Sequence, residues 1–111
     1  MPSVNKEAQL LPPSVCHAVR AMCEDYDRRQ EEIRRGKLPP ATLGHYMMLN
    51  AAIDAALESC CEENVREAIR RDIASHTGHR FTQLYYLSPG TYKERKRKSK
   101  LAIARALGLL P

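Results

Sequence analysis

The chain has 111 residues, of which 43% are hydrophobic and 28% are charged, and this composition is typical of one small globular domain. It contains no apolar run of the about eighteen residues that a membrane-spanning helix needs. The N-terminal sequence MPSVNKEAQLLPPS has no apolar segment of the kind found in secretory signals, which predicts a cytoplasmic protein. Its four cysteines are then expected to be reduced thiols.

The positive charge of the protein is concentrated in one short segment. The chain has 18 Lys and Arg against 13 Asp and Glu, a net charge of +5. Residues 93–100, KERKRKSK, hold six of these basic residues and one acid, Glu94, so the rest of the chain is neutral overall. Such an asymmetry favours a role for this segment in contacting an anionic partner.

Residues 1–13 are polar or proline-bearing without periodicity, and we expect a flexible arm. Ser14 is a candidate N-cap for a first helix that ends at Gly36. Its apolar residues at helical spacing are Val15, Val19, Met22, Tyr26 and Ile33. The charged sequence CEDYDRRQEEIRR within this helix predicts an exposed face with i,i+4 pairs.

A second helix is expected to begin at Pro39 or Pro40, since proline suits the first helical turn. The residues that mark this helix are Leu43, Tyr46, Met47, Ile53 and Leu57. Because the connection to the first helix is short, the two helices should form an antiparallel hairpin over residues 14–58.

The sequence SCCE at 59–62 fits a capping box in which Ser59 and Glu62 satisfy each other's backbone N–H groups. A third helix should follow and end near Gly78. It carries Val65, Ala68, Ile69, Asp72 and Ile73 at helical spacing. The segment FTQLY at 81–85 is long enough for only one or two helical turns.

The last helix is predicted from Ser88, as its N-cap, to Leu107, with Pro89 in its first position. One stripe of this helix should pack on the third helix, and it consists of Tyr92, Ser99, Ile103, Ala106 and Leu110. Basic side chains then cover most of the other sides. The expected fold is all-α, with four to five helices in one domain over 14–111: the hairpin, then a helix-turn-helix over 59–111.

The arrangement LSPGTYKER resembles the second helix of the sigma-factor region 4 helix-turn-helix, with Leu87, Ser88, Thr91, Tyr92 and Arg95 in the matching positions. The longer sequence TYKERKRKSKLAIARALGL resembles small ArpU/RinA-type transcription regulators of Gram-positive phages and prophages, over roughly residues 60–110. The turn departs from that pattern, because Tyr85 and Tyr86 replace its common glycine.

This resemblance implies a transcription regulator that binds double-stranded DNA, with its recognition helix, 88–107, in the major groove. Ser88 and Thr91 would contact phosphate or a base edge. The residues expected to line the groove or its phosphates are Arg80, Lys93, Glu94, Arg95, Lys96, Arg97, Lys98 and Lys100. Glu94 has two open interpretations, as an acceptor from a cytosine amino group or as an i,i+4 partner of Lys98.

Other interpretations of the chain stay open. The basic segment could be a solvated face or a nuclear localisation signal, and the protein could bind RNA polymerase or RNA instead of a DNA site. Leu101, Leu109 and Leu110 could form the seam of a homodimer or pack on the N-terminal hairpin.

Catalytic and metal sites are not expected. No nucleophile elbow, glycine-rich phosphate loop or paired carboxylates stand out, so no enzyme activity and no cofactor are predicted. Cys60, Cys61, His76 and His79 are metal-ligand types, but adjacent cysteines on a helix diverge, and zinc sites usually space them by about two to four residues.

Overall fold

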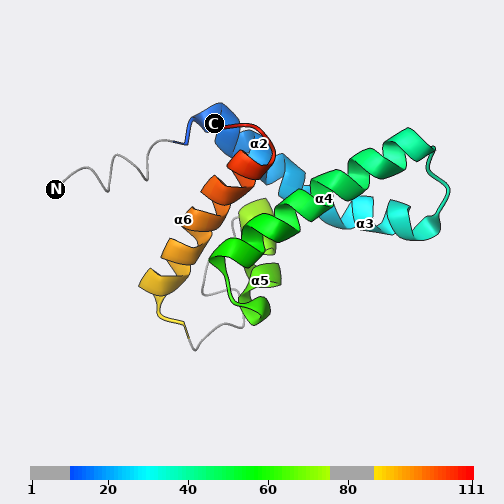
Figure 1. Cartoon of the computed structure of the whole chain (residues 1–111). Helices are drawn as coiled ribbons and strands as arrows, with labels where there is room; N and C mark the ends of the chain where they lie inside the picture. Colours follow the sequence, from blue (N-terminus) through cyan, green and yellow to red (C-terminus); the bar gives the residue numbers. More distant parts are fainter. Residues whose placement is uncertain (1–10, 76–86) are drawn as a thin grey trace.

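The computed structural model describes residues 11–75 and 87–111, and over these residues the chain is helical with no strand. The predicted all-α fold is confirmed. The helices are α2 (Pro13–Glu24), α3 (Tyr26–Arg35), α4 (Pro40–Cys60), α5 (Glu63–Ser75) and α6 (Pro89–Ala106) (Figure 1). None of these five helices is both long and apolar enough to cross a membrane. The predictions for the arm at 1–10, for Gly78 and for the short helix at 81–85 lie outside the described residues.

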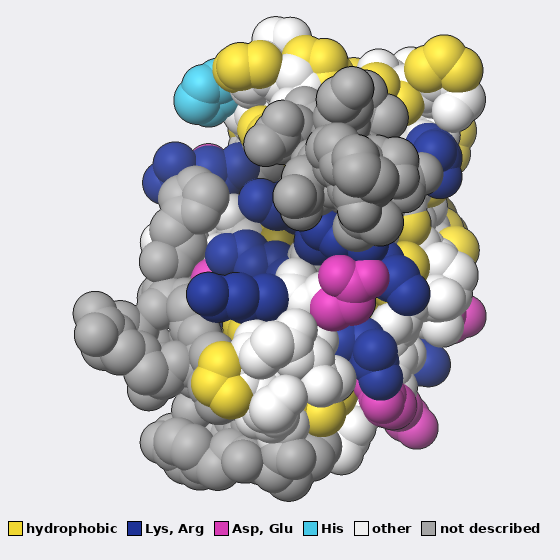
Figure 2. Space-filling view, turned by 90° about the vertical axis from the view of Figure 1, so that its left-hand side faces the viewer, with side chains coloured by type: hydrophobic (Ala, Val, Ile, Leu, Met, Phe, Trp, Pro, Cys, Tyr) yellow, Lys and Arg dark blue, Asp and Glu magenta, His cyan; other side chains and the backbone are white. Residues whose placement is uncertain are grey.

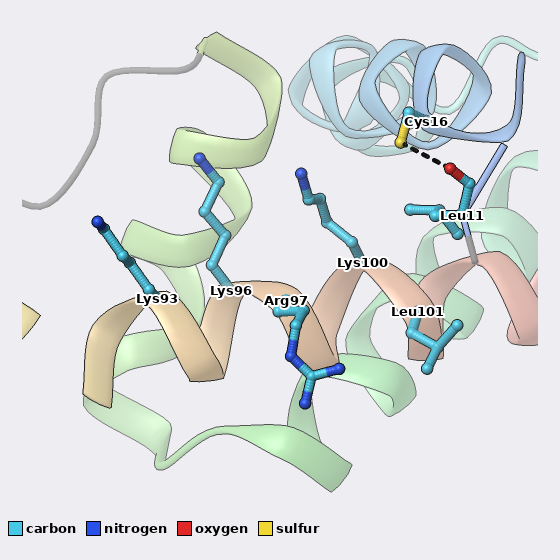
Figure 3. A pocket seen from close by; sticks show the side chains of 7 residues that line it. All are labelled: Leu11, Cys16, Lys93, Lys96, Arg97, Lys100 and Leu101. Atoms are coloured by element: carbon cyan, nitrogen blue, oxygen red, sulfur yellow. Dashed lines mark hydrogen bonds between the residues drawn. The ribbon is translucent and has the colours of Figure 1, made fainter. Parts of the chain in front are cut away.

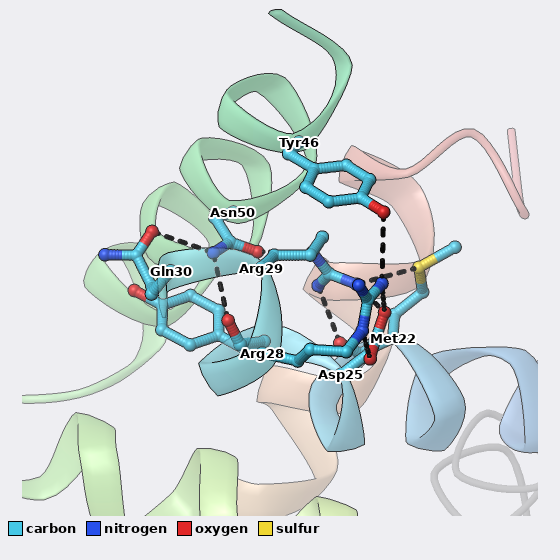
Figure 4. Close-up of polar contacts among 8 residues, drawn as sticks. Met22, Asp25, Arg28, Arg29, Gln30, Tyr46 and Asn50 are labelled. Carbon is cyan, nitrogen blue, oxygen red and sulfur yellow. Dashed lines mark hydrogen bonds and ion pairs between the residues drawn. The ribbon is translucent and has the colours of Figure 1, made fainter. Parts of the chain in front are cut away.

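The predicted first helix is divided in two at Asp25, so the expectation of one continuous helix over this segment is wrong. Asp25 has φ −91° and ψ 0°, and it separates α2 from α3. The division frees the carbonyl of Met22, which accepts a hydrogen bond of 2.7 Å from Nη2 of Arg29 (Figure 4). A side chain seven residues further on thus replaces a backbone partner at the end of α2.

Arg29 is buried, with 1% of its surface exposed, which corrects the prediction that this charged stretch is an exposed face. Its Nε donates to Oδ1 of Asn50 on α4 at 2.7 Å. Asn50 is also buried, and its amide donates to the carbonyl of Tyr26 and to the Gln30 side chain (Figure 4). Because a buried polar group must be hydrogen-bonded, this network fixes α3 against α4.

The α3–α4 hairpin turns where the sequence predicts it. Gly36 ends α3 in the left-handed region at φ 71°, and its N–H donates to the carbonyl of Ile33 at 3.1 Å. Pro40 occupies the start of α4, as expected. The predicted hairpin over 14–58 is only partly right, however, since α3 packs on α4 while α2 packs mainly on α5. The α3–α4 hairpin projects away from the other helices (Figure 1).

Two predicted N-caps are wrong. Ser14 lies inside the first turn of α2, because Pro13 already occupies the first helical position. Ser59 lies in the last turn of α4, where its hydroxyl donates back to the carbonyl of Ala56 at 2.7 Å, and α5 begins only at Glu63. The Ser59 hydroxyl therefore hydrogen-bonds a carbonyl of α4 instead of capping the N-terminus of α5.

One core joins α2, α4, α5 and α6. Its buried apolar residues are Val19, Cys23, Ile53, Ala56, Leu57, Cys61, Val65, Ile69, Ile73, Tyr92, Ile103 and Ala104. The predicted inner face of α5 is confirmed, because Val65, Ile69, Asp72 and Ile73 are buried and Ala68 packs against the core. On α4, Ile53 and Leu57 are buried, whereas 52% of Met47 is exposed.

The last helix packs mainly on α4 and makes smaller contacts with α2 and α5, whereas α5 was the predicted partner. Tyr92, Ser99 and Ile103 of the predicted stripe are buried. Ala106 is exposed instead, because the chain reverses at Gly108 and the N–H of Leu109 donates to the carbonyl of Ala104. Leu109 and Leu110 consequently pack against the core of their own chain.

Candidate nucleic-acid interface

The start of α6 is capped as predicted. The Ser88 hydroxyl oxygen accepts from the backbone N–H of Thr91 at 3.1 Å, and the same hydroxyl donates to Oγ1 of Thr91 at 2.9 Å. Pro89 occupies the first turn. Ser88 is exposed, so its remaining acceptor capacity faces solvent beside the positive end of the helix dipole.

A buried polar cluster anchors the N-terminal half of α6 on α5. Asp72 is 0% exposed, and its Oδ2 accepts a hydrogen bond of 2.5 Å from the hydroxyl of Tyr92. Its other oxygen lies 3.1 Å from Nζ of Lys96, whose side chain is 20% exposed. Burial, followed by this hydrogen bond to Asp72, raises the pKa of Tyr92, so the phenol remains the proton donor. Lys96 thus neutralises a carboxylate that has no access to water.

Two further contacts hold the same helix. The Cys61 thiol and the Ser99 hydroxyl lie 3.1 Å apart in the core, and burial raises the pKa of this thiol. Arg95 donates two hydrogen bonds, of 3.1 and 3.0 Å, to the carboxylate of Glu62 just before α5. These bonds lower the pKa of Glu62 to about 2. Both contacts fix the rotation of α6 about its own axis, and they thereby fix the direction in which its basic side chains extend.

Glu94 forms ion pairs within its own helix. Its carboxylate accepts two hydrogen bonds from Arg97, the shorter of 2.7 Å, and lies 3.7 Å from Nζ of Lys98. Hydrogen bonding to Arg97 lowers the pKa of Glu94, so the group is ionised at neutral pH. The predicted contact with Lys98 is therefore present, together with a closer one to Arg97 that the sequence analysis did not consider.

A basic pocket of about 230 Å³ lies between α6 and the start of α2. Its lining residues are Lys93, Lys96, Arg97 and Lys100, together with Leu11, Cys16 and Leu101. Lys93, Lys96 and Lys100 extend from the same side of α6, whereas Arg97 points the other way (Figure 3). Basic side chains also gather on this face in the space-filling view (Figure 2).

The lysines of this pocket differ in their partners. Lys96 is bound to Asp72, whereas Lys93 and Lys100 form no ion pair within 11–75 and 87–111. Like charges held this close on one helix repel one another, and an anion between them would relieve that repulsion. The pocket is therefore suited to a phosphate group, with Lys93 and Lys100 as the cations most available to it.

The structure brings nine of the ten predicted site residues onto one helix and its cap, and the tenth, Arg80, lies outside the described residues. Leu11 and Cys16 were not predicted from the sequence, and they complete the pocket from the other end of the chain. No local signal identifies them, because their position depends on how α2 packs against α6. His76 and His79 also fall outside the described residues, and the remainder of the chain holds no group of three potential metal ligands.

Comparisons with protein-family models, with curated proteins and with solved structures find no match to this chain.

Proposed function

We propose that the protein is a DNA-binding transcription regulator of phage or prophage origin, and that α6 enters the major groove of double-stranded DNA. The observation that carries this proposal is the basic pocket, in which Lys93 and Lys100 lack an ion-pair partner among the described residues. The resemblance of residues 87–95 to sigma-factor region 4 supports entry of α6 into the groove with its N-terminal end, which Ser88 caps, facing the DNA.

The spacing of the basic side chains suits a groove. Lys93 and Lys100 are seven residues apart, which corresponds to about 10 Å along a helix. The major groove is about 12 Å wide, so the two lysines can reach phosphates at both ends of this stretch. The buried contacts of Tyr92 and Ser99 hold α6 in a fixed orientation, which limits the entropy lost on binding.

The salt dependence of duplex binding tests the proposal. If four to six phosphates are neutralised, the logarithm of the affinity should fall against the logarithm of the salt concentration with a slope of about −4 to −6. A flat response, or no binding at about 50 mM salt, would contradict the proposal. Single-stranded DNA and RNA of the same sequence serve as competitors, and equal affinity for them would instead favour a non-specific or RNA-binding protein.

Matched variants separate phosphate contacts from base reading. Lys93→Gln and Lys100→Gln should each reduce the salt slope by about one and weaken all sequences alike. Arg97→Gln should weaken a selected site more than random DNA if Arg97 reads a base. Arg105→Gln is the control, because Arg105 is exposed near the end of α6 and does not line the pocket. Selection from a random duplex pool supplies the site, and its failure to enrich any sequence would argue against specific recognition.

A further inference from the structure

One side of α4 is apolar although it faces solvent. This helix buries Asn50, Ile53 and Leu57, and the residues on its opposite side, all exposed, are Ala41, Gly44, Met47, Met48, Ala51 and Ala55, which we call the α4 surface. Met47 and Met48 are 52% and 58% exposed, respectively. Between Pro40 and Ile53 the helix has no Lys, Arg, Asp or Glu, in a chain of which 28% is charged. An exposed apolar side of this kind marks a candidate interaction surface.

The two ends of the α4 surface carry opposite charges. Beside its N-terminal end, the hairpin turn presents three exposed basic residues, which are Arg34, Arg35 and Lys37. Glu31 pairs with both arginines, whereas Lys37 forms no ion pair among the described residues, so this end keeps a net positive charge. Beside its C-terminal end lie three exposed acids, which are Asp54, Glu58 and Glu63. A surface with an apolar middle, one positive end and one negative end is complementary to its own copy turned end over end, and opposite potentials that meet in this way favour one register.

We infer that a second copy of this chain docks on the α4 surface in an antiparallel, two-fold arrangement, with Met48 near the axis. Ala41 of one copy then lies opposite Ala55 of the other, and each basic hairpin turn meets the acidic end of its neighbour. Apart from its chain neighbours and the nearby backbone of its own helix, no atom lies within 4 Å of the position that a Cβ on Gly44 would occupy, so the space beside the helix is open. Small residues along the contact let the two helices approach closely.

A second copy fits the surface better than an unrelated partner would, because the two-fold rotation places the basic end of each copy against the acidic end of the other. The contact uses the face of α4 opposite the core, and the basic residues of α6 are not part of it. The inference is therefore independent of DNA binding, and either proposal can fail without the other.

Sedimentation equilibrium of the full chain tests the dimer. The wild-type protein should be dimeric at about 100 μM, and Met48→Arg and Ala51→Arg should each weaken association at least about tenfold. His17→Arg is the matched control, since it adds the same charge at an exposed position of α2. Circular dichroism verifies that each variant keeps its helical content. A monomeric wild type, or α4 variants that associate as well as the control, would overturn the inference.

Disulfide crosslinking tests the orientation. In a background with Cys16→Ser and Cys60→Ser, the two remaining cysteines are buried. Chains with Ala41→Cys mixed with chains with Ala55→Cys should form a mixed dimer on oxidation, whereas either population alone should crosslink poorly. Efficient crosslinking of each population with itself and not with the other would overturn the antiparallel arrangement.

Charge reversal tests the contact between the two ends. Lys37→Glu and Glu58→Lys should each weaken the dimer, and the doubly changed chain should recover most of the affinity.

Discussion

The ammonium group of Lys96 lies 3.1 Å from Oδ1 of Asp72, a carboxylate with no exposed surface. The sequence predicts that Lys96 contacts phosphate. The ion pair gives this lysine a second task, because a buried carboxylate without a cation is strongly unfavourable. Loss of DNA binding after substitution of Lys96 would therefore have two explanations, a lost phosphate contact or a destabilised fold, and a measurement of stability separates them.

We predict that Lys96→Met lowers the free energy of unfolding by about 2–4 kcal/mol, since it removes the ammonium group that lies against the buried Asp72 carboxylate. Lys100→Met, the matched control, should change stability by less than about 0.5 kcal/mol. Urea denaturation measures both. The double variant Asp72→Asn with Lys96→Met should be more stable than the sum of the single losses implies, and strict additivity would argue against the pair.

Substitution of Glu94 should strengthen non-specific DNA binding. Glu94→Gln removes the ion pairs to Arg97 and Lys98 and leaves the exposed Lys98 ammonium available to phosphates. The slope of the logarithm of the affinity against the logarithm of the salt concentration should become steeper by about one. The control is Glu67→Gln, which removes the same charge from an ion pair with Arg71 on α5.

The same variant distinguishes the two interpretations of Glu94. If Glu94 accepts from a cytosine amino group, Glu94→Gln should weaken the selected site while it strengthens random DNA. Stronger binding to both would leave Glu94 with only its intrahelical pairs. Affinities unchanged for both sequences would count against placing α6 at the interface.

Acid should destabilise the protein in part through Glu62. The hydrogen bonds from Arg95 lower the pKa of Glu62 from 4.5 to about 2. A carboxyl group with a lowered folded-state pKa contributes stability above its unfolded-state pKa and loses that contribution as the pH falls toward the folded-state value. We expect this contribution to be complete above about pH 4.5 and to disappear toward about pH 2.

Glu62→Gln should therefore be less stable than the wild type at neutral pH and lose less stability on acidification. Urea midpoints measured across this pH range test the expectation. Glu24→Gln is the control, because Glu24 is exposed and forms no ion pair among the residues described. Parallel pH profiles for the wild type and Glu62→Gln would show that the Arg95 contact does not contribute in solution.

Arg29 should contribute more to stability than its neighbour Arg28. Arg29→Met would leave the Asn50 side-chain oxygen and the Met22 carbonyl without their shared donor, at a cost of about 2–3 kcal/mol. Arg28 is 52% exposed in its pair with Asp25, and Arg28→Met should cost less than about 1 kcal/mol. Thermal unfolding of the two variants tests the difference, and equal losses would argue against the buried network.

Local chemistry in the sequence determined where several helices begin and end. Gly36 ends α3 because the left-handed conformation there suits glycine. Pro40 begins α4 because its fixed φ suits a first turn. Ser88 caps α6 because its hydroxyl reaches a backbone N–H three residues ahead. Helical periodicity alone likewise predicted the inner face of α5 and the all-α fold, and the charge count placed the net charge of the protein on α6.

Only the tertiary structure decided how these parts meet. Asn50 and the freed Met22 carbonyl draw Arg29 inward where α2 and α3 separate, although the local sequence is highly charged. Asp72 engages Lys96 across 24 residues, and Leu11 and Cys16 close a pocket with lysines about 80 residues away. Patterns along the chain encode which face of a helix is buried. The partner of a buried polar or charged group is set by the packing of distant segments, because only that packing removes water from the group and brings a counterpart within hydrogen-bond reach.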